Sequence, residues 1–238
     1  MRKREKMNQL IKGILPSKKD GKCTISRTIT EPFSWKMIKE ALDRNDMPYQ
    51  VGDIVTSKLR NGNAQEWVIT DIGKDYIRFE ARDCIKDAEH EMNKVLTNAG
   101  GIALSEMQGY LDNEIWNLLP SDLQEVIATV DRKYMDGDEE KIYRTKLFLP
   151  SASEVFDENN CFGEENLYKQ LNYYRDRHHR VKLNGRGGGS AYWWLSSPDS
   201  GNATYFCGVT TAGAAGNGGY AGDSNGVAPC FQIVSSES

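Results

Sequence analysis

Three short segments in the first half of the chain are rich in Val, Ile, Tyr and Phe placed between polar residues. They cover residues 52–59, 65–72 and 75–85, and Asn-Gly and Gly-Lys-Asp sequences separate them. Short segments of this composition between turn signals are typical of β-strands joined by hairpins. The pattern therefore predicts an antiparallel meander of three strands.

A helical period of hydrophobic positions occurs before and after the predicted meander. We predict helices over residues 33–45, 104–120, 121–134 and 166–180, with Pro120 ending the second and Ser121 capping the third. The apolar positions expected to face the core are Phe33, Met37, Ile38, Leu42, Met107, Leu111, Ile115, Leu118, Leu167, Leu171 and Tyr174.

The remaining segments predict strands and one capped helical turn. Residues 141–150 are expected to form a strand, and SASE at 151–154 has the spacing of a capping box that opens a short helix. YWWLSSP at 192–198 predicts a core strand, because adjacent large aromatics can cover both faces of a sheet. GVAPCFQIV at 226–234 predicts a matching final strand, at an edge or bulged, since Pro229 cannot donate a ladder hydrogen bond.

This order of elements indicates an α+β fold. Helices are expected around an antiparallel sheet whose last strands come from the C-terminal third of the chain. At 238 residues the chain is long enough for one domain with a substantial core, which we place at residues 31–238. Two framework strands, 192–198 and 226–234, would hold a turn-rich segment of about thirty residues between them.

Composition changes abruptly inside that turn-rich segment. From Ser196 to Phe231 there is no Lys, Glu, Gln, Met or Trp, although 53 of the 238 residues are of these types and about eight would be expected in proportion. Gly, Ala, Thr, Asn, Ser and Tyr dominate instead. A loop region poor in long side chains would have this composition, and loops on a rigid scaffold commonly carry binding specificity.

Charge argues against nucleic acid and membrane surfaces as partners. The net charge is −4, and no apolar run approaches the length of a transmembrane helix or of a signal-peptide core. The first twenty residues are an exception, with seven Lys and Arg against Glu5 and Asp20, and residues 1–30 are expected to be a solvated, partly disordered arm. We expect the protein to be made in the cytoplasm. A virion component or a surface-displayed protein would also be made there.

Residues that often carry chemistry do not form a recognisable site. The five cysteines are odd in number and widely spaced, so buried thiols are favoured over a disulfide framework or a zinc site. NGRGGGS at 184–190 lacks the phosphate-loop pattern and indicates a flexible connection. The adjacent His178 and His179 would point in different directions on a helix and are expected at the surface.

Several of these stretches together resemble a known family. LFLPSASEV at 147–155, YWWLSSP and GVAPCF, with the meander before them, resemble a domain family of gut bacteria and their phages over about Trp67 to Val234. That family resembles a divergent C-type-lectin-like fold, related in architecture to formylglycine-generating enzymes. The segment from Trp193 to Phe231 looks like the variable region of a diversity-generating retroelement target protein.

The retroelement resemblance implies a reason for the missing residue types. In such systems a reverse transcriptase randomises template adenines, so that AAC codons become N-N-C codons. An N-N-C codon cannot encode Lys, Glu, Gln, Met or Trp, the five types absent from 196–231. The resemblance implies a variable ligand-binding region at about 196–226, on a protein that binds a cell-surface protein or glycan and is not an enzyme.

By the same resemblance, individual positions are expected to vary or to stay constant. The scaffold positions are Ala203, Phe206, Cys207, Val209, Gly213, Ala215 and Ala221. The variable, ligand-binding positions are Asp199, Thr204, Tyr205, Gly208, Thr210, Thr211, Ala212, Ala214, Gly216, Gly218, Gly219, Tyr220, Gly222 and Asp223. Tyr205 and Tyr220 are expected to be exposed anchors flanked by small adaptable residues, as in antibody paratopes.

No metal and no cofactor are expected. The sugar-binding signatures of calcium-dependent lectins are absent, and Asp199 with Asp223 supplies too few calcium ligands. One alternative is a copper oxidase like the formylglycine-generating enzymes, using Cys207 and Cys230, although the GGSW-like and GFR-like motifs of that family are missing. Another alternative is a structural phage component whose tail sequence does not vary.

Overall fold

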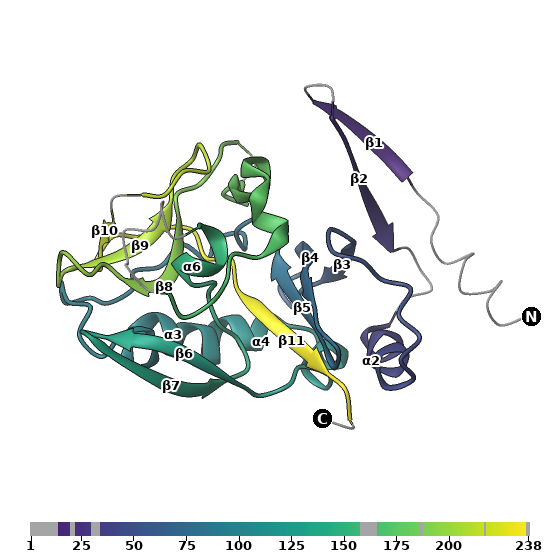
Figure 1. Ribbon diagram of the computed structural model, residues 1–238, viewed down its shortest axis with the longest axis horizontal. Helices are drawn as coiled ribbons and strands as arrows, with labels where there is room; N and C mark the ends of the chain where they lie inside the picture. Colours follow the sequence, from purple (N-terminus) through teal and green to yellow (C-terminus); the bar gives the residue numbers. More distant parts are fainter. Residues whose placement is uncertain are drawn as a thin grey trace, which may run out of the picture.

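The computed structural model describes residues 14–19, 22–29, 34–157, 166–185, 188–216 and 218–236. Figure 1 shows a mixed α+β arrangement of three sheets, in which most neighbouring strands are antiparallel. The largest sheet and the smaller sheet that carries the C-terminal loops lie at opposite ends of the molecule in this view. The predicted α+β class is confirmed.

The largest sheet has six strands in the order β1-β2-β3-β4-β5-β11. Their bounds are β1 Ile14–Lys19, β2 Lys22–Ile29, β3 Ile54–Lys58, β4 Ala64–Ile72, β5 Tyr76–Ala81 and β11 Cys230–Val234. The predicted meander is confirmed as β3, β4 and β5, which pair in antiparallel register. Only β2 and β3 pair in parallel among these strands.

The basic N-terminal segment contributes to this sheet. Within the arm expected to be partly disordered, β1 and β2 form an antiparallel hairpin that projects from the body in Figure 1. Arg27 attaches the hairpin, since its Nε lies 2.8 Å from Asp53 Oδ1 and its Nη2 lies 2.5 Å from Oδ2. The rest of the arm, residues 1–13, 20, 21 and 30, lies outside the described residues.

An aromatic cluster joins the helix before the meander to the last strand of the chain. Helix α2, Trp35–Asp43, buries Trp35, whose ring lies 5.3 Å from Phe79 and 5.7 Å from Phe231 between centroids. Trp67 meets Phe231 at 5.2 Å. Edge-to-face contacts of buried rings stabilise beyond area burial alone. The predicted face of this helix is confirmed at Ile38 and Leu42, while Phe33 lies outside the described residues.

The predicted helix 104–120 forms, with one irregular turn. A single-turn 3-10 helix η1, Ile102–Leu104, precedes α3, Glu106–Tyr110, which continues through a π turn η2, Leu111–Ile115, into α4, Trp116–Leu118. Met107, Leu111 and Ile115 are fully buried, as the period predicts. Ser105 caps the start by accepting a hydrogen bond from the Gln108 backbone.

The prediction of a helix over 121–134 is wrong beyond its first turn. Helix α5 covers only Ser121–Gln124, with Pro120 at the N-cap position, and Val130–Asp136 is strand β6. β6 pairs antiparallel with β7, Glu139–Thr145. The reason is the two-residue turn Gly137-Asp138 between the paired Asp136 and Glu139, in which Gly137 has φ +58°. Arg132 and Tyr134 of β6 are buried and Lys133 between them is exposed, which is the period of a strand.

The helix predicted over 166–180 is also wrong. Two short 3-10 turns replace it, η3 Asn172–Arg175 and η4 Arg177–Arg180. Asp176 lies between them in an extended conformation, and its carboxylate accepts the His178 N–H, so the side chain begins a new turn instead of continuing a helix. Tyr174 is buried as expected, whereas Leu167 and Leu171 are half-buried.

The strand YWWLSSP belongs to a separate three-stranded sheet in the order β10-β9-β8. Its strands are β8 Trp193–Pro198, β9 Tyr205–Val209 and β10 Gly219–Tyr220. The expectation that 192–198 and 226–234 form matching framework strands is wrong in this respect, because β11 pairs with β5 in the large sheet. β11 is an edge strand, as Pro229 predicted, and the Pro229 carbonyl accepts the Ala81 N–H at 2.9 Å.

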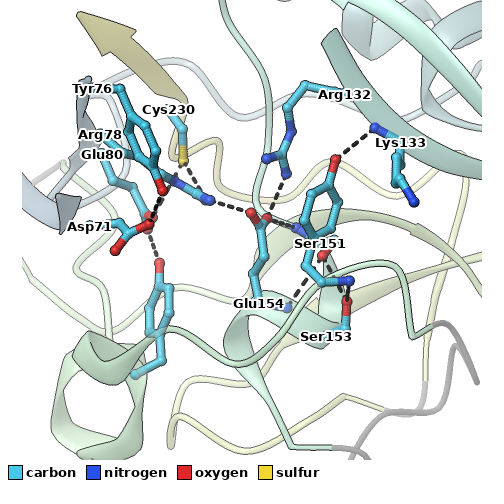
Figure 2. Close-up of polar contacts among 12 residues, drawn as sticks. Asp71, Tyr76, Arg78, Glu80, Arg132, Lys133, Ser151, Ser153, Glu154 and Cys230 are labelled. Carbon is cyan, nitrogen blue, oxygen red and sulfur yellow. Dashed lines mark hydrogen bonds and ion pairs between the residues drawn. The ribbon is translucent and has the colours of Figure 1, made fainter. Parts of the chain in front are cut away.

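The predicted capping box is confirmed, and its carboxylate has a further role. Ser151 and Glu154 cap helix α6, Ala152–Val155, reciprocally. Figure 2 shows Glu154 between two arginines: Arg132 Nη2 lies 2.7 Å from its Oε2, and Arg78 pairs with its Oε1. Both arginines and Glu154 are less than 10% exposed. The helix start is therefore attached to β5 and β6 by buried charges.

A second buried carboxylate extends this network. Glu80 of β5 pairs with Lys182 Nζ at 2.8 Å and accepts hydrogen bonds from Tyr174 Oη and, at 3.4 Å, from Cys230 Sγ. Lys182 also lies over the Trp193 ring, with Nζ 4.9 Å from its centroid. These named groups are buried and paired with one another, so the network connects both main sheets.

Replacing the central carboxylate tests the importance of the network. Glu154→Gln leaves Arg78 and Arg132 buried without a counter-charge, and we expect the free energy of unfolding to fall by about 3 to 5 kcal/mol. Denaturant unfolding at neutral pH measures it. The matched control is Glu66→Gln, which breaks the solvent-exposed pair with Arg82 and should cost about 0 to 1 kcal/mol. Equal losses in the two variants would contradict the assignment.

Acid should weaken the same contact. Burial opposes ionisation of Glu154, but the charges of Arg132 and Arg78 outweigh it and lower its pKa from the ordinary 4.5 to about 2. Because the pKa of Glu154 is lower in the folded state than in the unfolded state, its ionised form stabilises the fold above pH 4.5. This contribution is lost as pH falls from 4.5 towards 2. The difference corresponds to about 3 kcal/mol. We expect the unfolding free energies of the parent and Glu154→Gln to converge over this range.

Candidate functional site

The loops on and around β9 and β10 form a surface at one end of the molecule (Figure 1). We call the segment from Asp199 to Asn225 the tail surface. Behind it lies β8, whose six residues are all buried. Trp193 and Trp194 are fully buried, which confirms the predicted core strand. A rigid aromatic strand thus supports a region built from turns.

The structure places most of the predicted variable positions within reach of solvent. Five are exposed: Thr211, Ala212, Tyr220, Gly222 and Asp223. Seven are half-buried: Asp199, Thr204, Tyr205, Thr210, Ala214, Gly218 and Gly219. Gly208 and Gly216 are buried, so the expectation of a surface position is wrong for these two. The physical reason is that the ring of Tyr192 lies over both glycines.

The predicted scaffold positions mostly point inward. Phe206, Cys207, Val209, Gly213 and Ala221 are buried and Ala215 is half-buried. Ala203 is exposed, but its carbonyl oxygen accepts the Asn98 N–H at 2.7 Å, so it contributes through its backbone. Four of the five residues of β9 are therefore buried, and most of the variable positions that reach solvent lie in the loops after it.

Two tyrosines form the largest aromatic feature of the tail surface. Tyr205 of β9 and Tyr220 of β10 are directly paired across the strands, and their rings meet edge to face with centroids 4.6 Å apart. Tyr220 is 48% exposed. A hydrogen bond to Tyr220 raises the pKa of Tyr205. The pair offers a wide, partly polar contact area with few torsions to freeze.

The two aspartates of the tail surface are used by the loops themselves. Asp199 Oδ1 accepts the Gly201 N–H at 2.8 Å, and Asp223 Oδ2 accepts the Tyr220 N–H at 3.0 Å. The Asp199 contact is an Asx turn, and the Asp223 contact closes the turn between Tyr220 and Asp223. Among the described residues, no group of three His, Cys, Asp or Glu side chains gathers to hold a metal ion.

The segment 88–101, which sequence reasoning did not single out, supports the loops of the tail surface by hydrogen bonds. Asn98 Nδ2 donates to the carbonyl oxygens of Asp199, Asn202 and Tyr205 at 3.0 to 3.1 Å. The Asn93 N–H donates to the Ala221 carbonyl at 2.9 Å. An asparagine in a loop carries no signal that identifies such distant partners, so only the fold reveals this support.

The same segment adds apolar side chains beside the tail surface. Val95 is 70% exposed and Leu96 is 51% exposed. A Cβ atom built on Gly222 would lie 3.1 Å from Leu96 Cδ2, so Leu96 directly adjoins a predicted variable position. The candidate surface therefore extends beyond the C-terminal tract to residues 95 and 96.

The two cysteines of the oxidase alternative lie on strands that do not pair. Cys207 is on β9 and Cys230 is on β11, in different sheets, and both are buried. Burial raises the pKa of Cys230, which favours the thiol over a metal-binding thiolate. The two cysteines of this alternative therefore do not lie on neighbouring strands of one sheet.

The glycine-rich stretch and the two adjacent histidines make contacts that stabilise their own local structure. Asn184 N–H donates to the Gly189 carbonyl at 3.0 Å, so the glycine-rich stretch closes a turn, with residues 186 and 187 outside the described part. His178 is exposed beside Asp176, and His179 stacks on Tyr173 with centroids 4.2 Å apart. The two histidines have different neighbours, as expected.

With this geometry in view, comparison with known proteins identifies the family. A model described as a domain of unknown function, DUF6273, matches residues 70–235. The chain belongs to this family. No curated protein and no solved structure matches it. The DUF6273 region runs from β4 to the end of β11, so it contains the buried charge network and the tail surface. Within the described part of this chain, no helix is both long and apolar enough to span a membrane.

Asn98 offers a test of how the DUF6273 domain supports its tail surface. Asn98→Ala removes three hydrogen bonds to loop carbonyls, and we expect amide hydrogen exchange at Asp199 and Tyr205 to become faster, with a loss of about 1 to 3 kcal/mol of stability. Asn113→Ala is the matched control, because it removes one exposed bond to the Gly109 carbonyl. Unchanged exchange at residues 199 and 205 would refute the role of Asn98.

Proposed function

We propose that this DUF6273 domain is a ligand-binding protein whose tail surface is diversified by a retroelement. The observation that best supports this proposal is a division within the C-terminal tract. Twelve of the fourteen positions expected to vary reach solvent, while the segments on either side of them, 193–198 and 226–231, are buried. Trp193, Trp194 and Val227 are each 0% exposed. Such a division allows the sequence of the surface to change while the core stays constant.

The residue types of the tract support the same proposal. Lys, Glu, Gln, Met and Trp are missing from 196–231, although several positions there are exposed and would accept a long side chain. Exposed loop positions normally tolerate Lys and Glu readily. The absence at these exposed positions therefore favours N-N-C codons over a loop region that is merely poor in long side chains.

The finer fold assignment is part of the proposal. We propose a C-type-lectin-like fold, in which a loop-rich region near the C-terminus is displayed on antiparallel strands. The small β8–β9–β10 sheet, its supporting segment 88–101 and the distant final strand β11 are compatible with that architecture. The assignment rests on the resemblance of the short sequence motifs together with this arrangement of strands.

The proposed ligand is a protein or glycan on a cell surface. The Tyr205–Tyr220 pair supplies an aromatic anchor, and anchors of this kind concentrate binding energy in interfaces. The adjoining Val95 and Leu96 add exposed apolar contacts. Binding would be polar and hydrated elsewhere, since Thr, Asp and glycine backbone dominate the remaining positions.

Sequencing of the coding region in a natural population tests the proposal. We expect substitutions to cluster at the fourteen positions, to follow N-N-C codons, and to spare Trp193, Trp194 and Val227. A neighbouring reverse transcriptase gene with a near-identical template rich in AAC codons should accompany them. The codons of residues 52–85 serve as the internal control. Substitutions scattered evenly over the gene, or a constant tail, would instead favour a structural phage component.

A further inference from the structure

Tyr192 occupies the space that two missing side chains would take. The residue comes directly before β8, and its ring meets Trp194 edge to face with centroids 6.1 Å apart. A Cβ atom built on Gly208 would lie 2.3 Å from Tyr192 Cε1, and one built on Gly216 would lie 2.3 Å from its Oη. Non-bonded heavy atoms do not approach that closely. The Tyr192 ring in its present position and a side chain at either glycine therefore exclude each other.

The backbone at these two glycines does not itself require glycine. Gly213 and Gly218 have φ values of +73° and +71°, a region that side chains other than glycine rarely adopt. Gly208 and Gly216 are outside that region. The atoms nearest to their built Cβ atoms all belong to the Tyr192 side chain. The obstacle at 208 and 216 is thus one movable ring.

Little polar attraction keeps that ring in place. Tyr192 Oη is buried and has no hydrogen-bond partner among the described residues. Burial also raises the pKa of Tyr192. A buried hydroxyl without a partner costs free energy, and rotation of the side chain into water would restore its hydrogen bonds. The ring is held by packing on Trp194 and the glycine backbone, which a new side chain at 208 or 216 would disrupt.

We infer that Tyr192 is a further specificity-determining residue of the tail surface, and that residues 208 and 216 decide whether its ring lies against the backbone or projects into solvent. The role of Tyr192 in ligand recognition rests on the proposed function. Because glycine is one of many residues that an N-N-C codon encodes, most variants would carry a side chain at 208 or 216 and expose the tyrosine. In this chain, with glycine at both positions, Tyr192 is half-buried and its ring lies against the glycine backbone.

The consequence is an aromatic contact that the diversified codons do not encode. Tyr192 lies before Ser196, outside the tract that lacks the five residue types. A small substitution at either glycine would add a large ring to the surface. Tyrosine is well suited to such contacts, since it combines a large area with two torsions.

Solvent exposure of Tyr192 tests the inference without any ligand. We would incorporate 3-fluorotyrosine at position 192 of the full chain and measure broadening of its ¹⁹F signal by a soluble gadolinium chelate. Gly208→Ser and Gly216→Ser should each increase the broadening severalfold over the parent. Ala212→Ser is the matched control, because Ala212 is exposed on the same surface, and it should leave the broadening unchanged.

Three results would overturn the inference. One is a signal as shielded as in the parent when both glycine variants are folded. Another is failure of both variants to fold unless Tyr192→Ala is added, which would show that the ring cannot leave its place. The third is failure to fold even with Tyr192→Ala, which would show that the backbone requires glycine. None of these results depends on sequence diversity in the population, so they are distinguishable from failure of the proposed function.

Discussion

The pairing of Glu154 with Arg78 and Arg132 is the interaction on which the rest of the structure depends. Taking three charged groups out of water costs free energy that only close mutual pairing offsets, so the strands and helix that carry them have to meet in one geometry. Glu154 also caps α6, and the first N–H of that helix donates to Ser197 Oγ of β8 at 2.8 Å. The charge network thus positions β8, the strand that supports the tail surface.

The arrangement separates stability from surface chemistry. The large sheet, α2 and the charge network bury aromatic and ionic groups that lie outside the loops of the tail surface. Those loops are held chiefly through their backbones, by Asn98, by the Asn93 N–H and by turns within the loops. Side chains that point outward from such loops take little part in packing. Such an arrangement is what the proposed diversification of that surface requires.

Much of the fold follows from local signals in the sequence. Strands β3, β4 and β5, the helix with Met107 and Leu111, and the Ser151–Glu154 capping box each depend on residues close together in the chain, and each was predictable. Two helical predictions failed for local reasons as well. The Gly137-Asp138 turn favoured a hairpin over a continued helix, and the Asp176 side chain began a new turn in the segment 166–180. In both cases one residue at a turn, Gly137 or Asp176, outweighed the hydrophobic period.

By itself the sequence determined the class of the fold, the buried segments on either side of the tail surface, the unusual residue types of 196–231 and most of the positions that reach solvent. Tertiary structure alone decided that β11 pairs with β5 and not with β8, that Arg132 meets Glu154, and that Tyr192 covers Gly208 and Gly216. The physical reason is range. Backbone propensity and alternation act between neighbours, whereas a buried ion pair or a filled volume joins side chains that meet only when the chain has folded.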